Sequence, residues 1–166
     1  MPSSTSWWGS RVRQFRAHVR ASVRPQERLD LVAWTTPAQR DLFDAMHIAD
    51  RRHGLDVVAS LRANRVTETD VLLAGLLHDS GKGDTGAWPR VAWTLGERYG
   101  PWVWRLAALL PGFGPAFARL RDHAEVSASL AATAGCSQQT VDLIRHQAAP
   151  RDPRYGELLR LADEAN

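Results

Sequence analysis

Apolar residues recur along this chain at intervals of three and four residues, which is the period of a helix that buries one face. The segment 7–23 shows this best, because its apolar residues follow one another at such intervals and arginines fill many of the remaining positions. No segment alternates apolar and polar residues for long enough to indicate a β-strand. The pattern therefore predicts an all-α protein.

Turn and capping residues divide this pattern into separate helices. Thr36 followed by Pro37 is a typical helix start, and three glycines between residues 81 and 86 indicate a loop. Pro25 either ends the first helix or begins a short second one. The predicted helices span residues 7–23, 37–46, 49–63, 70–78, 88–99, 101–110, 116–134, 138–147 and a last segment that ends near residue 165.

Length and composition favour one compact domain. The chain has 166 residues, of which 44% are hydrophobic. We divide it into a basic amphipathic extension over residues 1–35 and a helical domain over residues 36–166. No apolar run is long enough to cross a bilayer, no secretory leader is visible, and Cys136 is the single cysteine. We therefore expect a cytoplasmic protein.

The charge pattern affects only the expected partners. The net charge is +3, and the positive excess lies among the arginines at the front of the chain. This modest value does not predict a stable complex with nucleic acid. Residues 7–23 could contact a membrane surface or a protein partner through their basic amphipathic face. The alternative is that their apolar stripe packs on the domain while the arginines face water.

The stretch LLAGLLHDSGKGD, residues 72–84, carries the clearest chemistry. It places His78 and Asp79 side by side at the end of an apolar segment. Neighbouring side chains on a helix diverge by about 100°. The two can therefore share an ion only at a helix end or distortion, unless Asp79 bridges two ions. In the simpler interpretation, His78 interacts with the negative end of the helix dipole and Asp79 is solvated.

Four further segments join this one in a recognisable order: RHGLDVVASL, DHAEVSASLAATAG, VDLIRHQ and LADEAN. Together they resemble the HD superfamily of metal-dependent phosphohydrolases over roughly residues 49–166. The resemblance implies an HD-domain-like helical bundle, preceded here by the extra N-terminal helix. Two additional histidines make the sequence similar to the binuclear HD-GYP branch. No Gly-Tyr-Pro follows His146, so cyclic di-GMP is not implied as the substrate.

The resemblance also implies a site for two divalent ions. The implied ligands are His53, His78, Asp79 and Asp163 for the first ion, and the bridging Asp79 with His123 and His146 for the second. Imidazole and carboxylate ligands suit iron, manganese or zinc. The implied catalytic residues are Asp79, which would orient a metal-bound hydroxide, and Lys82, which would stabilise charge on the phosphoryl group.

Some ligand assignments stay open in the sequence. His47 competes with His53, and Glu164 competes with Asp163, although helical phase after Leu159 favours Asp163. Ser80 could cap a helix or donate a hydrogen bond to Asp79. Three arginines lie near the proposed ligands and are candidates for the rim of a substrate site: Arg51, Arg121 and Arg145. Four tryptophans are expected in the core or in a pocket wall: Trp88, Trp93, Trp102 and Trp104.

The function that the resemblance implies is hydrolysis of a phosphoester. The expected partner is a phosphorylated small molecule, such as a nucleotide or cyclic nucleotide. One alternative keeps the fold and uses a di-iron centre with oxygen. Another is a non-catalytic signalling or interaction module. Lys82 beside the glycines favours phosphate over the oxygenase alternative.

Overall fold

The computed structural model describes residues 21–166, and this range contains nine α-helices, one short 3-10 helix and no strand. The all-α prediction is confirmed. The helices are α2 (Pro25–Leu31), α3 (Pro37–Ala45), α4 (Ile48–Ala63), α5 (Thr69–Leu77), the 3-10 helix η1 (Ser80–Lys82), α6 (Ala87–Tyr99), α7 (Pro101–Ala107), α8 (Phe113–Thr133), α9 (Gln138–Arg145) and α10 (Gly156–Ala165). The amphipathic helix predicted over residues 7–23 lies almost entirely outside the described residues.

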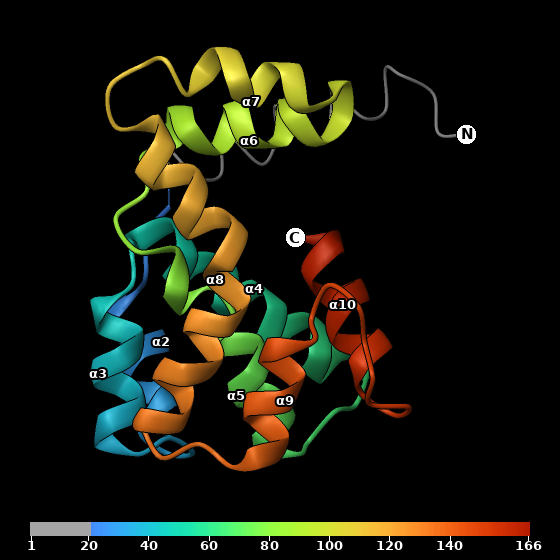
Figure 1. Ribbon diagram of the computed structural model, residues 1–166. Coiled ribbons are helices and arrows are strands. Elements are labelled where there is room, and N and C mark those ends of the chain that lie inside the picture. The colour runs from blue at the N-terminus through green and yellow to red at the C-terminus, as the bar shows by residue number, and fades with distance from the viewer. Residues whose placement is uncertain (1–20) are drawn as a thin grey trace.

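Helix α5 forms the centre of the bundle. Every residue from Val71 to Leu77 is buried, which fits a helix that is apolar on all sides. α5 packs against α4, α9 and α10, and Figure 1 shows it between α4 and α9 in the lower half of the molecule. This packing holds the end of α5, where His78 follows, deep inside the bundle.

Local capping explains where several helices begin. Thr36 accepts a hydrogen bond from the Gln39 backbone, the Gln39 side chain accepts one from the Thr36 backbone, and Pro37 opens α3. Pro25 begins α2. The predicted start of α8 was three residues too late, because the helix begins at Phe113. Pro115 lies in its first turn, where a missing backbone N–H costs no intrahelical bond.

Helices α6 and α7 form a hairpin that lies across one end of the bundle (Figure 1). The indole N–H of Trp104 donates to the backbone oxygen of Trp93 at 3.0 Å, and the two rings stack with centroids 4.9 Å apart. α7 has no buried residue. Trp88 and Trp102 are 70% and 58% exposed, so the expectation that they would fill the core or a pocket wall was wrong for these two.

No helix between residues 21 and 166 has the length and apolar character needed to span a membrane. The predicted division at residues 35 and 36 stays a prediction. Leu31 of α2, which precedes this division, is 2% exposed and belongs to the same core cluster as Phe43.

Candidate metal centre and pocket

The His78–Asp79 pair lies at a helix end, as its chemistry requires. α5 ends at Leu77, His78 is its C-cap, and Asp79 precedes η1 with backbone angles of φ −100° and ψ 4°. This change of direction lets both side chains face the same space. Gly81 permits it, because a Cβ there would stand 2.5 Å from the His123 backbone oxygen on α8.

Three side chains from three helices meet beside this turn. His53 on α4, His78 after α5 and Asp163 on α10 each offer one ligand atom, and these atoms all lie within 4.8 Å of one another. The Asp163 Oδ1 atom is 2.8 Å from His53 Nε2 and 3.3 Å from His78 Nε2. Two imidazoles and a carboxylate make this a possible metal site of the kind that divalent transition ions occupy.

The orientation of His78 supports that interpretation. Its Nδ1 atom donates to the Gly75 backbone oxygen at 3.0 Å, which leaves Nε2 as the atom that faces the cluster. Nε2 is buried and has no hydrogen-bond partner, although Asp163 and Asp79 oxygens lie 3.3 and 3.4 Å away. A buried nitrogen of this kind needs a partner. The donor set therefore fits a divalent cation.

The electrostatics of the cluster also favour a cation. Burial lowers the pKa of His78, but the carboxylates of Asp79 and Asp163 outweigh it and raise that pKa to about 9. Burial would raise the pKa of Asp79 and Asp163, yet nearby histidines, joined at Asp79 by Lys82, hold both well below the usual range. Two carboxylates thus flank the buried His78 ring, and their charge favours a cation at this position.

Asp79 has a second cationic neighbour. Its Oδ1 faces His78, whereas its Oδ2 accepts from the Lys82 ammonium at 2.5 Å. The side chain of Asp79 is only 2% exposed. His123 Nε2 lies 3.9 Å from Asp79 Oδ1, and burial, followed by the charge of Lys82, lowers the pKa of His123. The structure therefore brings Asp79, Lys82 and His123 together beside the three-residue cluster.

His146 lies differently from His123. It is the C-cap of α9, which ends at Arg145, two residues earlier than predicted, and its Nδ1 donates to the Asp142 backbone oxygen at 2.9 Å. The neighbouring Gln147 faces the pocket instead, where its Nε2 is 3.2 Å from His123 Nε2. The proposed role of His146 stays a prediction.

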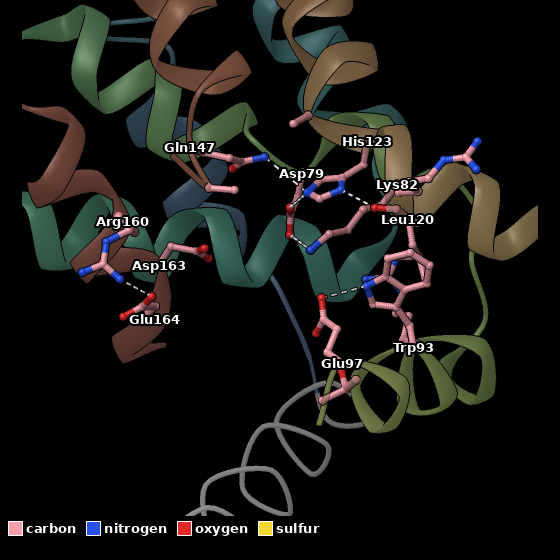
Figure 2. A pocket seen from close by; sticks show the side chains of 15 residues that line it. Asp79, Lys82, Trp93, Glu97, Leu120, His123, Gln147, Arg160, Asp163 and Glu164 are labelled. Carbon is pink, nitrogen blue, oxygen red and sulfur yellow. Dashed lines mark hydrogen bonds and ion pairs between the residues drawn. The ribbon is translucent and has the colours of Figure 1, made fainter. Parts of the chain in front are cut away.

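Asp163 of the cluster and the adjacent Asp79 line a pocket of about 590 Å³. Figure 2 shows Asp79, Lys82 and His123 on one side and Asp163 on another, with Trp93 and Glu97 of α6 opposite. Its charged and aromatic lining residues are Asp79, Lys82, Arg90, Trp93, Glu97, Arg121, His123, Arg160, Asp163 and Glu164. The volume suits a small organic molecule.

The structure separates the competing ligand candidates. His47 accepts from the Ala49 backbone at the start of α4, and it is His53 that lies in the cluster. Glu164 pairs with Arg160, whereas Asp163 faces His53. Ser80 neither caps a helix nor bonds to Asp79, because its hydroxyl is buried without a partner.

The three arginines proposed for the rim divide similarly. Arg121 lines the pocket but pairs with Asp122, and Arg51 and Arg145 are not among the lining residues. Sequence reasoning missed Arg90, whose guanidinium binds both carboxylate oxygens of Asp50. The 40 residues between the partners give no local signal of this pair. Gln147 gave no signal of its own in the sequence, because the adjacent His146 is the residue with typical metal-ligand chemistry.

Comparison of the chain with profiles of known protein families, with curated proteins and with solved structures gives no significant match. The resemblance found in the sequence therefore stays a prediction.

Proposed function

We propose that this protein is a metal-dependent phosphohydrolase that resembles the HD superfamily and acts on a phosphoester such as a nucleotide. The observation that carries the proposal is the buried, unpartnered Nε2 of His78, aimed at the carboxylates of Asp79 and Asp163. His53, His78 and Asp163 would hold the ion, with Asp79 beside them. A bound divalent ion supplies a Lewis acid that makes water more acidic and polarises a phosphoryl oxygen.

The protein side chains have distinct roles in this proposal. The Gly75 carbonyl fixes the proton of His78 on Nδ1, so that Nε2 stays directed at the cluster. His53 holds Asp163 in place through the 2.8 Å contact. The buried Asp79 stays ionised, accepts from the Lys82 ammonium and has its Oδ1 atom 3.4 Å from His78 Nε2. All three ligands stand on packed helices, which fixes their positions before substrate arrives.

The pocket offers positive charge to a phosphoryl group. Lys82 lies at its inner wall with a side chain that is 23% exposed, so its ammonium can reach a substrate oxygen. In the reaction, the oxygen of water forms a bond to phosphorus and the ester P–O bond breaks. The departing oxygen receives the proton that water loses. Trp93 and Glu97 on α6 would contact the part of the substrate beyond the phosphate.

A matched pair of variants tests the proposal. Asp163→Asn removes a proposed ligand, whereas Asp56→Asn makes the same change at a more exposed carboxylate that pairs with Arg52 and does not line the pocket. Each protein is stripped with chelator, reloaded with Mn²⁺, Fe²⁺ or Zn²⁺, desalted and analysed for metal. The same samples are assayed on phosphomonoesters, phosphodiesters and nucleotides. We expect Asp163→Asn to lose the metal and at least about 100-fold in activity, because removing a ligand destroys the site.

We expect Asp56→Asn to keep both the metal and the activity. Wild-type protein that retains no metal after desalting would refute the proposal. Full metal loading without turnover of any phosphate ester would also refute it, and oxygen consumption by the iron form would then indicate the oxygenase alternative.

A further inference from the structure

We propose that this site takes a single divalent ion and that the Lys82 ammonium supplies the second positive charge, in the place where the sequence resemblance implies a second ion. This inference rests on the proposed function and deepens it. It concerns the side of the pocket formed by Asp79, Lys82, His123 and Gln147, which we call the lysine side.

The carboxylate of Asp79 is the first reason. A carboxylate that bridges two ions gives one oxygen to each. Here Oδ1 faces His78 at 3.4 Å, whereas Oδ2 is 2.5 Å from the Lys82 ammonium. An ammonium at that distance already occupies the position from which a second cation would bind Oδ2. Two cations around one oxygen would repel each other strongly, and most of all in a buried site.

The ring of His123 is the second reason. Its Nδ1 is 2.6 Å from the Leu120 carbonyl oxygen, which can only accept, so the proton lies on Nδ1 and the lone pair on Nε2. That lone pair accepts from the Gln147 amide at 3.2 Å. The other amide hydrogen of Gln147 has the His78 carbonyl as its acceptor at 3.4 Å. The nitrogen that a second ion would need therefore accepts from an amide N–H, which is no ion ligand, whereas His53 Nε2 contacts Asp163 Oδ1, another ligand atom of the first ion.

His146 is the third reason. Its Nδ1 donates to the backbone of its own helix at Asp142, and it does not belong to the group of converging ligand atoms found among residues 21–166. The ligand set implied for a second ion thus has one carboxylate oxygen held by Lys82, one imidazole held by Gln147, and one histidine that does not converge with the others. In contrast, the ligand atoms of His53, His78 and Asp163 already lie within 4.8 Å of one another.

One ion and one ammonium would place positive charge on two sides of a bound phosphoryl group. The ion would lie at the His53 end and Lys82 at the other, across the Asp79 carboxylate. Lysine binds phosphate as a point charge, so it tolerates small differences in the position of the phosphoryl group. The lysine side is therefore a subsite for a substrate oxyanion.

The number of ions can be measured without any assay of activity. The full chain is titrated with Mn²⁺, desalted, and analysed for manganese per chain and by electron paramagnetic resonance. We expect about one ion per chain with the spectrum of isolated Mn²⁺, since only one set of ligand atoms converges. Two ions a few ångströms apart would instead give a spin-coupled spectrum. The spectrum is recorded on the wild-type protein, so this test does not depend on any variant.

Two histidine variants extend the test. We expect His146→Ala to keep one ion per chain and His53→Ala to retain less than about a tenth of that amount. Two coupled ions in the wild type, with one lost in His146→Ala, would overturn this inference and leave the proposed function intact. No bound ion in the wild type would overturn both, so the two failures are distinguishable.

The anion subsite is tested with inorganic phosphate as the probe. Phosphate binding to the Mn²⁺-loaded protein is measured by calorimetry for the wild type and Lys82→Met. We expect the variant to bind phosphate at least about 10-fold more weakly, because it loses a charge-assisted contact. Equal phosphate affinity in the two proteins would overturn the assignment of Lys82 to this subsite.

Discussion

The two walls of the pocket differ in how firmly they are built. On one wall, the residues of α5 that lead to His78 are all buried, and α5 packs against helices on several sides. The other wall belongs to α6 and α7, where Gly96 is the single buried residue of α6 and α7 has none. The proposed ion ligands belong to α4, α10 and the end of α5 on the first side, whereas Trp93 and Glu97 line the pocket from the second.

This difference indicates that the two walls have separate functions. Ligands of an ion must hold their positions to within fractions of an ångström, which a packed core provides. A wall with few buried contacts opens at lower free energy and tolerates substitution. We therefore expect changes in the bundle to affect global stability and ion binding together. Changes in the α6–α7 hairpin should affect substrate binding with little effect on the ion.

Replacing one leucine on each wall gives the largest contrast. Leu77 is fully buried in α5, whereas Leu109, which follows α7, is 81% exposed. We expect Leu77→Ala to lower the free energy of unfolding by about 2–5 kcal/mol through lost burial and a cavity. Leu109→Ala should change it by less than about 0.5 kcal/mol. Urea unfolding followed by circular dichroism measures both, and similar losses would refute the comparison of the two walls.

The ion pair that joins the walls comes next in size. Arg90 of α6 binds both carboxylate oxygens of Asp50 on α4, at 2.5 and 2.7 Å, and Asp50 is 3% exposed. Asp50→Asn would leave the buried guanidinium without its counter-charge, and we expect a loss of about 1.5–3 kcal/mol. Hydrogen exchange should rise mainly in α6 and α7. Asp56→Asn, a change at a more exposed carboxylate paired with Arg52, is the control.

An increase in exchange that spreads evenly over the bundle would contradict the separate attachment of the hairpin. The separate attachment of the hairpin would also be contradicted if hydrogen exchange in α6 and α7 rose as much in Asp56→Asn as in Asp50→Asn.

Gly96→Ala acts inside the hairpin. A Cβ at this position would stand 1.9 Å from Trp104 Nε1, so the indole would have to leave its stack on Trp93. We expect a cost of about 1–3 kcal/mol, as for other overpacked sites. Near-ultraviolet circular dichroism should change, and bound manganese should not. Gly114→Ala is the control, because nothing lies within 4 Å of a Cβ there. Loss of the ion in Gly96→Ala would show that the walls are not independent.

Local patterns in the sequence predicted the all-α fold, whereas the residues of the central cluster were implied by the family resemblance. Helical spacing and the Thr36–Pro37 start were sufficient for the all-α bundle. His78 was identifiable because an imidazole beside a carboxylate is unusual at the end of an apolar helix. Asp163 was favoured over Glu164 by its phase relative to Leu159, and it is Asp163 that joins the cluster.

What the sequence could not predict depends on exact helix ends and on distant contacts. α9 ends at Arg145 rather than at residue 147, and one residue along a helix rotates a side chain by about 100°. Beyond this helix end, Gln147 contacts His123, whereas His146 bonds to the backbone at Asp142. Periodicity marks an apolar face without saying what covers it, so the exposure of Trp88 and Trp102 was not predictable.

Helix α2 offers the smallest effect and a second test of how peripheral elements are attached. Glu27 of α2 accepts hydrogen bonds from Arg24 and Arg52, and its side chain is 18% exposed. Arg24, followed by Arg52, lowers the pKa of Glu27 from 4.5 to about 2, against the opposing effect of burial. The stabilisation is therefore complete above pH 4.5 and is lost as the pH falls through about 2.

We expect Glu27→Gln to cost about 1 kcal/mol at pH 7, as is usual for partly exposed ion pairs. The difference from the wild type should shrink as the pH falls from about 4.5 to 2, which urea unfolding at each pH measures. Comparing the two proteins at the same pH cancels the other carboxylates, since these titrate in both. If Glu27→Gln lowered the free energy of unfolding as much as Asp50→Asn does, burial of an ion pair would not determine how much the pair stabilises this protein. A difference that stays constant with pH would show that Glu27 acts through packing and not through its charge.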